Sequence, residues 1–158
     1  MSPNTAGQGN APQSALNTYV DPFRGYNFKL EIQGITEAHF TEVGGMEVKV
    51  NPIAYREGGN SQVVHHVPGY TEYGAITLRY GLTKSKELWD WFMSGVKGKV
   101  QRRNISIVLL DSDGTTEVIR WNLVNAWASH WRGAMLNALD QEIAIESLTL
   151  VCETIERV

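Results

Sequence analysis

The segment YNFKLEIQ, residues 26–33, decides the fold class of this chain, because apolar and polar side chains alternate along its whole length. Successive side chains of a β-strand point to opposite faces, so a period of two residues indicates one covered and one solvated face. The apolar positions are Tyr26, Phe28, Leu30 and Ile32. The segment therefore predicts a half-buried strand at the start of the ordered chain, followed by a turn at Gly34.

Alternating or apolar stretches of strand length continue along the rest of the chain. They predict strands at 35–43, 46–51, 76–80, 104–110 and 142–156, the second of which is expected to end at Pro52. The sequence DSDG at 111–114 predicts a hairpin turn into a long return strand. Because residues 115–131 are too long for a uniform strand, a bulge or bend is expected near Asn125.

Residues 84–97 change to the 3.6-residue period of an amphipathic helix. Its predicted core face consists of Leu88, Trp89, Trp91, Phe92, Met93 and Val96. Thr83 or Ser85 is available as the N-cap, and Gly95 or Gly98 stands near the end. Six or seven strands and one helix predict a mainly β fold, a two-sheet antiparallel β-sandwich or partly open barrel with a flanking α-helix.

Length and composition limit the possible classes of protein. A chain of 158 residues fits one domain, expected over residues 21–158, after a flexible uncharged tail at 1–20. A net charge of −3, with both signs mixed, argues against nucleic-acid binding by the monomer. With one cysteine, Cys152, no secretion signal and no long apolar run, the chain is expected to be synthesised and assembled in the cytoplasm and to have no membrane segment.

None of the enzyme signatures considered fits the sequence. His65 and His66 are adjacent and so point to opposite faces of a strand, where one metal ion cannot easily bind both. Asp111 and Asp113 are spaced like the opening of a calcium loop, but the glycine and glutamate that such a loop needs are missing from their positions. We therefore expect no catalytic residue, no metal site and no cofactor.

The stretch YREGGNSQVVHHVPG, residues 55–69, interrupts the orderly strand pattern. Several predicted strands are long and carry few of the prolines and inward charges that protect a sheet edge, so neighbouring copies are expected to complete the sheets. In this setting residues 52–73 are predicted to form an extended hairpin arm, with Gly58, Gly59 and Asn60 at a flexible tip. The arm would contact another molecule.

A series of landmarks runs through the sequence in order: DPFRGYNF, FTEVGGMEV, IAYREGGN, HHVPGYTEYGAITLRYGLT, ELWDWF, KVQRRNISIVLLD, IRWNLVNAWASHW and EIAIESLTLV. From Asp21 to about Glu156, the series closely resembles the inner tube (tail tube) proteins of contractile injection systems and contractile phage tails. The resemblance implies a structural protein and not an enzyme. Hexameric rings of such proteins stack into a hollow tube, which a contracting sheath drives through a target envelope to deliver cargo.

The resemblance also implies partners: copies of the chain itself, the sheath, baseplate or spike proteins, a tube terminator, and cargo in the lumen. The particle would be phage-tail-like, and either released from the cell or active from inside it. Ring-stacking residues are expected along the arm, at Tyr55, Arg56, Glu57, Asn60, His65, His66 and Tyr70. Polar positions of the strands, Lys29, Glu31 and Lys49, are expected to face the lumen.

Two other functions fit the sequence. A tube-to-spike or baseplate adaptor of the same family would form a ring but no long tube. A ligand-binding β-sandwich would stack exposed tryptophans on sugars and would remain a monomer or dimer.

Overall fold

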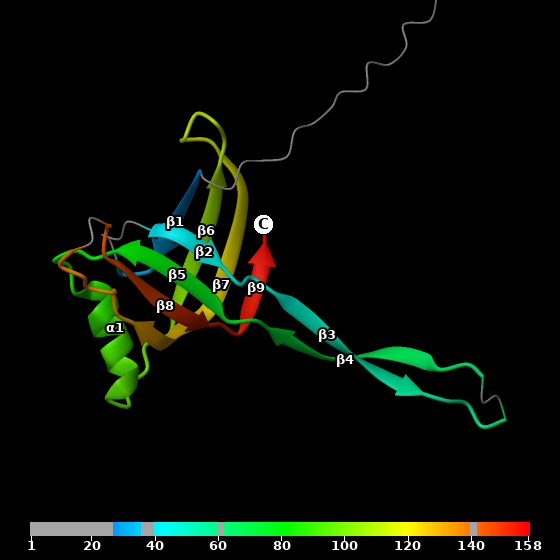
Figure 1. The fold of residues 1–158 in the computed structure, drawn as a ribbon. Helices are drawn as coiled ribbons and strands as arrows, with labels where there is room; N and C mark the ends of the chain where they lie inside the picture. The colour runs from blue at the N-terminus through cyan, green and yellow to red at the C-terminus, as the bar shows by residue number, and fades with distance from the viewer. Residues whose placement is uncertain (1–26, 36–39, 60–61, 140–141) are drawn as a thin grey trace, which may run out of the picture.

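The computed structural model describes residues 27–35, 40–59, 62–139 and 142–158, so the tail predicted at 1–20 lies outside the described residues. The described chain forms nine strands and one helix (Figure 1). The elements are β1 (Phe28–Ile32), β2 (Phe40–Gly44), β3 (Val48–Tyr55), β4 (His65–Tyr73), β5 (Ile76–Gly81), α1 (Glu87–Val96), β6 (Arg103–Leu110), β7 (Glu117–Arg132), β8 (Ile145–Val151) and β9 (Thr154–Arg157). The expectation of six or seven strands was too low, because the arm contributes two strands and the last predicted strand is divided.

Two antiparallel sheets share the long strand β7. The first half of β7 pairs with β6 and β9, and the second half pairs with β8. One sheet therefore has the order β1-β6-β7-β9, and the other has the order β7-β8-β5-β2. A shared strand folds the two sheets toward each other into a partly open barrel (Figure 1). The predicted mainly β fold with two sheets and a flanking helix is confirmed.

Asn125 marks the point at which β7 passes from one sheet to the other. Its φ of 51° is in the left-handed region, and the pairing with β6 slips between Arg103 and Ile105. Asn125 donates its backbone N–H to Asn104 Oδ1 at 3.1 Å and its side-chain N–H to Glu153 Oε2 at 2.8 Å. A bulge of this kind bends the strand and increases its twist. The predicted bend near Asn125 is confirmed.

The C-terminal part of the chain passes from one sheet to the other beside the bend of β7. β8 stops at Val151, and β9 begins at Thr154 on the other sheet. Between them the Glu153 N–H donates to the Val124 carbonyl at 3.0 Å. The prediction of one strand over 142–156 is therefore wrong, because the chain follows the bend of its partner β7.

The interior contains apolar side chains from both sheets and the helix. Its fully buried members are Ile76, Leu78, Ile105, Leu123, Leu148 and Leu150. Leu88 and Trp91 join them from α1, and the Trp91 indole N–H donates to the Gln101 carbonyl at 2.7 Å. No buried side-chain N or O atom among the described residues lacks a hydrogen-bond partner. The protomer thus has a closed core of its own.

Part of the predicted core face of α1 is wrong. Phe92 and Met93 are half-buried, but Trp89 is 40% exposed and Val96 is 62% exposed. The helix lies along the flank of the barrel and packs mainly on β7 (Figure 1). The barrel therefore covers only part of the apolar face of the helix. Trp91 lies at the centre of that part.

The start of α1 also differs from the prediction. Lys86 occupies the N-cap position, and no side chain caps the helix, so the assignment to Thr83 or Ser85 is wrong. The Thr83 hydroxyl instead accepts the Ser85 N–H at 3.4 Å, which turns the chain before the helix. At the other end, Gly98 has a φ of +82°, and the Lys99 N–H donates to the Ser94 carbonyl. Glycine in this conformation commonly ends a helix.

We expect Trp91 and Val96 to differ sharply in their contribution to stability. Trp91→Ala should lower the free energy of unfolding by about 3–5 kcal/mol, because it leaves a cavity in the core. Val96→Ala should change it by less than about 0.5 kcal/mol, because the side chain is exposed. Urea unfolding of the unassembled protomer measures both values. Similar losses for the two variants would contradict the orientation of α1.

Candidate functional site: surfaces for assembly

The strands β3 and β4 form a two-stranded sheet of their own, called the arm here, that leaves the barrel and extends far beyond it (Figure 1). β3 continues through Pro52 to Tyr55, so the predicted strand end at Pro52 is wrong. Pro52 lies opposite Pro68, and a two-stranded ribbon has free edges on which a missing N–H costs little. The arm therefore begins at Val48 and includes the strand predicted at 46–51.

The base of the arm is tightly fixed to the barrel. Gly45 has a φ of +86°, and a Cβ atom there would lie 2.5 Å from the Ala75 carbonyl oxygen. On the facing strand, the Gly74 N–H donates to the Glu47 carbonyl at 2.8 Å. These two glycines let the backbones of the outgoing and returning strands approach closely. The direction of the arm is thus set where it leaves the barrel.

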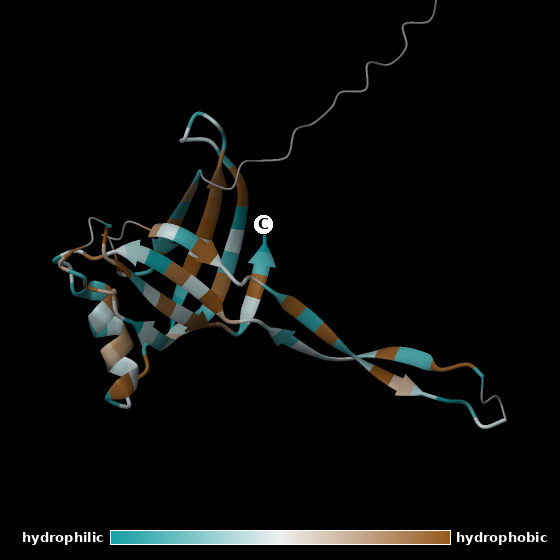
Figure 2. Ribbon diagram, viewed as in Figure 1, coloured by the Kyte–Doolittle hydropathy of each residue, from teal (hydrophilic) through white to brown (hydrophobic). Residues whose placement is uncertain are grey.

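Both faces of the arm carry exposed apolar side chains. Near the base, Val48 and Val50 share one face with Tyr73, which lies opposite Val48. Farther out, Ile53 and Val67 form a pair on the other face. Figure 2 shows brown, hydrophobic segments along the arm. Because a ribbon in water covers neither face, the arm is suited to contact on both sides.

The predicted stacking residues occupy different parts of the arm. Tyr55 and His65 face each other, with ring centroids 5.2 Å apart in a stacked arrangement, and His66 lies on the opposite face. Arg56 and Glu57 follow β3 in the tip, and Asn60 lies outside the described residues. Tyr70 lies in the irregular stretch between Val50 and Pro52 of the facing strand and is 66% exposed. Within the described residues, no group of three His, Cys, Asp or Glu side chains could hold a metal ion.

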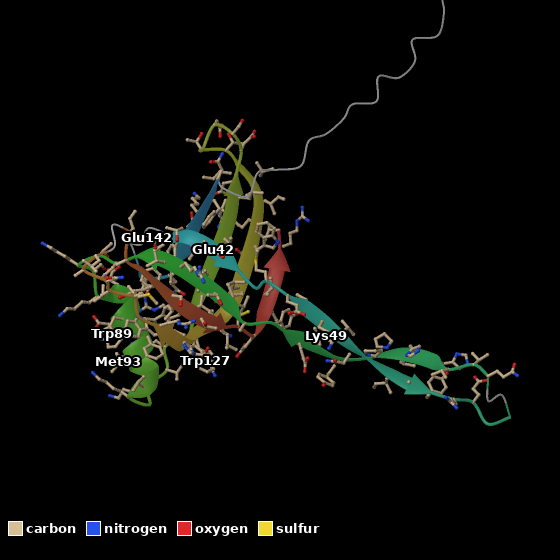
Figure 3. The ribbon with its side chains drawn as sticks, in the orientation of Figure 1. Glu42, Lys49, Trp89, Met93, Trp127 and Glu142 are labelled. Carbon is tan, nitrogen blue, oxygen red and sulfur yellow. The ribbon has the colours of Figure 1, made fainter. Side chains whose placement is uncertain are left out.

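The three predicted lumen residues lie on two different surfaces. Lys29 and Glu31 are on β1, on the outer face of the β1-β6-β7-β9 sheet, whereas Lys49 is on the arm (Figure 3). Lys29 lies 3.1 Å from Glu31 and 3.2 Å from Glu117, and Arg120 lies 3.2 Å from Glu31 and 2.8 Å from Glu117. The structure therefore brings two of the three residues into one charge network and separates the third.

The charge network shifts the pKa values of its members. A hydrogen bond from Lys29, aided by Arg120, lowers the pKa of Glu31. Arg120, followed by Lys29, lowers the pKa of Glu117, and hydrogen bonds to these carboxylates raise the pKa of Lys29. Between Lys29 and Arg120 in the sheet lies Val108, which is fully buried outside the main core. Long charged side chains can cover an apolar neighbour with their stems while their ends stay in water.

A second exposed apolar surface lies in the loop between β7 and β8. The exposed fractions of Met135, Leu136, Leu139 and Ile143 are 91%, 78%, 95% and 79%. The strands predicted from the sequence at 115–131 and 142–156 leave this segment as a connecting loop. A contact surface could have been predicted from the run GAMLNAL, residues 133–139. The run is mainly apolar but lacks the two-residue period of a strand, and such a composition is unusual for a loop exposed to water.

Beside this loop lies a pocket of about 310 Å³ lined by Tyr80, Leu82, Leu88, Trp89, Trp131 and Glu146, among others. Trp89 and Trp131 meet edge to face, with ring centroids 4.7 Å apart, and the Trp131 N–H donates to Glu146 at 3.4 Å. Burial and the nearby Glu146 carboxylate raise the pKa of the Tyr80 hydroxyl well above its ordinary value. The hollow thus combines an apolar wall with polar groups from Thr83, Ser85, Lys86 and Glu146.

Apart from the two strands of the arm, three strands have an open edge within the described part of the protomer. β1 pairs only with β6, β2 pairs only with β5, and β9 pairs only with β7. An open edge presents unpaired N–H and C=O groups, which can accept a strand from another chain. Together with the arm and the apolar loop, these edges are candidate surfaces for contact with other chains.

The family of the chain follows from its sequence match. Residues 24–156 match the family described as T4-like virus tail tube protein gp19. The chain belongs to the tail tube family. It is an inner tube protein of a phage-tail-like contractile particle, and its family is structural, so it is not an enzyme. The resemblance stated from the sequence landmarks is confirmed, and the ligand-binding sandwich is set aside.

Solved structures agree with this family. The tube protein is similar to a chain in the cryo-EM structure of an extracellular contractile injection system, the PVC sheath-tube complex in the extended state, with 28% identity and a TM-score of 0.78 over 87% of this chain and 91% of that one. It is similar to a chain in the PVC sheath/tube terminator structure, with 27% identity and a TM-score of 0.80 over 88% and 98%. A chain in the anti-feeding prophage cap structure, at 24% identity and a TM-score of 0.80 over 92% of this chain and 99% of that one, shows the same fold. No curated protein sequence matches this tube protein in a direct comparison.

We expect the charge network to be visible in carboxyl titrations. In a Lys29→Met variant the pKa of Glu31 should rise toward its ordinary value of 4.5, and that of Glu117 should rise less, because Arg120 is its main partner. A carboxyl group whose pKa is lower in the folded state than in the unfolded state stabilises the fold at higher pH. This stabilisation is lost as the pH falls through the pKa of the folded state. The variant should therefore lose less stability below pH 4.5 than the unchanged protein. Carboxyl chemical shifts against pH measure this, with Lys84→Met as the control that leaves both values in place.

Proposed function

We propose that this tube protein forms hexameric rings that stack into the main inner tube of an extracellular contractile injection particle. The observation that carries the proposal is the combination of a closed protomer core with open strand edges and a long apolar arm. A protein that functions alone has no use for surfaces of this kind, whereas a subunit of a tube needs one surface for the ring and another for stacking.

Ring closure uses the open edges of β1, β2 and β9. Identical subunits that join head to tail close into a ring when the rotation between them divides the circle. Main-chain pairing between edges gives such a contact regular geometry, and it removes the exposed edges at which unassembled sheets aggregate. Sheets that continue from subunit to subunit would make the wall of the tube.

The outer face of the β1-β6-β7-β9 sheet is proposed to line the lumen. Lys29 and Glu31, together with Glu117 and Arg120, give this face two positive and two negative charges that pair with one another. A paired, water-exposed network suits a channel through which cargo moves, because it offers little net charge for adhesion. Lys49 belongs to the arm and is assigned to no lumen surface.

The arm is proposed to contact the next ring through Tyr55, His65, Tyr70 and their neighbours. Its exposed apolar positions on both faces favour insertion between other subunits rather than contact along one side. Further proposed partners are the sheath, the baseplate or spike, a tube terminator and cargo in the lumen. Similarity to chains in sheath-tube and terminator structures supports these partners and the extracellular particle.

Electron microscopy of the purified protein tests this function. We expect six-fold rings and hollow tubes from the unchanged chain. A shortened arm is made by excising residues 54–66 and joining Ile53 to Val67 through Asn-Gly, since these two residues pair directly and a two-residue turn fits between them. This variant should give rings without tubes, because the part of the arm proposed to contact the next ring is missing. Tubes of normal length from the shortened chain would refute arm-mediated stacking. Rings without tubes from the unchanged chain would favour the adaptor function.

A further inference from the structure

The apolar loop between β7 and β8 is held in place at both ends. At its start, a Cβ atom on Gly133 would lie 2.9 Å from the Trp131 ring, so the chain turns closely over that ring. At its end, the Leu82 N–H donates to the Ala144 carbonyl at 2.9 Å. Within it, the Leu139 N–H donates to the Asn137 side chain at 3.1 Å. The exposed apolar side chains at 135–139 thus follow a fixed start, and Ile143 precedes a fixed end, as expected of a contact surface.

The loop and the arm lie at opposite ends of the protomer. Figure 1 shows the arm leaving the barrel on one side and the orange loop beside α1 on the other. Figure 3 places Lys49 on the arm and Glu142, in the loop, on the far side of the barrel. The arm therefore cannot cover the loop of its own chain. Two exposed surfaces at opposite ends can meet only between different copies.

We propose that the apolar loop is the surface of one copy that receives the arm of another copy. The receiving residues are Met135, Leu136, Leu139 and Ile143, and the inserted face of the arm carries Ile53, Tyr55 and Val67. This inference rests on the proposed stacking of rings and adds the surface on which the arm lies. A contact between two different patches of identical chains that does not close into a ring repeats along an axis, which is the symmetry of a stack.

Chemistry and shape make the two surfaces complementary. The distal face of the arm, with Ile53, Tyr55 and Val67, carries no Asp, Glu, Lys or Arg. The run at 133–139, with three of the four receiving residues, also carries none, whereas Ile143 follows Glu142 at the border of the surface. Apolar surfaces without charges can meet without leaving a charge desolvated. Beside the loop lie two hollows, of about 210 Å³ next to Met135 and Ile143 and about 310 Å³ next to Trp89, which can take up inserted side chains.

Site-specific photo-crosslinking tests the contact. A benzoylphenylalanine replaces Tyr55, the assembled tubes are illuminated, and the joined peptides are identified by mass spectrometry. The expected product joins two copies, with the second attachment within residues 133–145. The same probe at Ala54, which lies on the opposite face of the arm, is the matched control and should attach elsewhere. Attachment of the Tyr55 probe only to other segments, including residues 1–20, or to a sheath protein in intact particles, would overturn the proposal.

Substitution of the loop gives an independent test. Leu136→Ser together with Leu139→Ser should abolish tubes and leave rings, since both side chains are almost fully exposed and the protomer fold does not depend on them. Val96→Ser removes an exposed apolar side chain from α1, outside the arm, the loop and the open strand edges, and should leave tubes intact. Normal tubes from the loop variant would overturn the receiving surface while stacking by the arm stands. If the unchanged chain forms neither rings nor tubes, the proposed function fails, and this inference fails with it.

Discussion

The passage of β7 between two sheets at Asn125 is the constraint on which the rest of the structure depends. A left-handed residue in the middle of a sixteen-residue strand bends it, and the bend is fixed by hydrogen bonds to Asn104 and Glu153. Because β6, β8 and β9 all pair with β7, their directions follow from this one bend. The core between the sheets, and the open edges at their far sides, are consequences of the same shared strand.

Stability and assembly are separated in this protomer. The buried residues come from β1, β5, β6, β7, β8 and α1, together with Cys152, and none comes from β3 or β4. The arm, the apolar loop and the charge network lie outside this core. Substitutions on these surfaces can therefore change assembly while the protomer stays folded, whereas substitutions in the core change both. In the assembled state, copies that bind the folded protomer also stabilise it by mass action.

Local sequence patterns predicted the parts of the fold that local forces determine. Alternation located β1 and β5, the DSDG turn joined β6 to β7, and the length of β7 indicated its bend. The division into β8 and β9 depends on the bend of a distant partner, which no local pattern contains. The exposure of Trp89 and Val96 depends on how much of α1 the barrel covers. The apolar loop had no period at all, so its composition alone could have indicated a contact.

The apolar surfaces at the two ends of the protomer raise the question of how an unassembled chain avoids random association. The arm offers narrow faces that change sides along its length, from Val48 and Val50 to Ile53, so no broad apolar patch forms on either side. The loop presents its apolar side chains on a short, anchored segment. Stable contacts between proteins bury on the order of 1,000 Å² or more, which favours several such surfaces acting together over one acting alone. In the proposed ring, several copies of both surfaces would stand in fixed positions. Many modest contacts would then form together, and each would raise the effective concentration of the others. Stacking would then follow ring closure rather than compete with it.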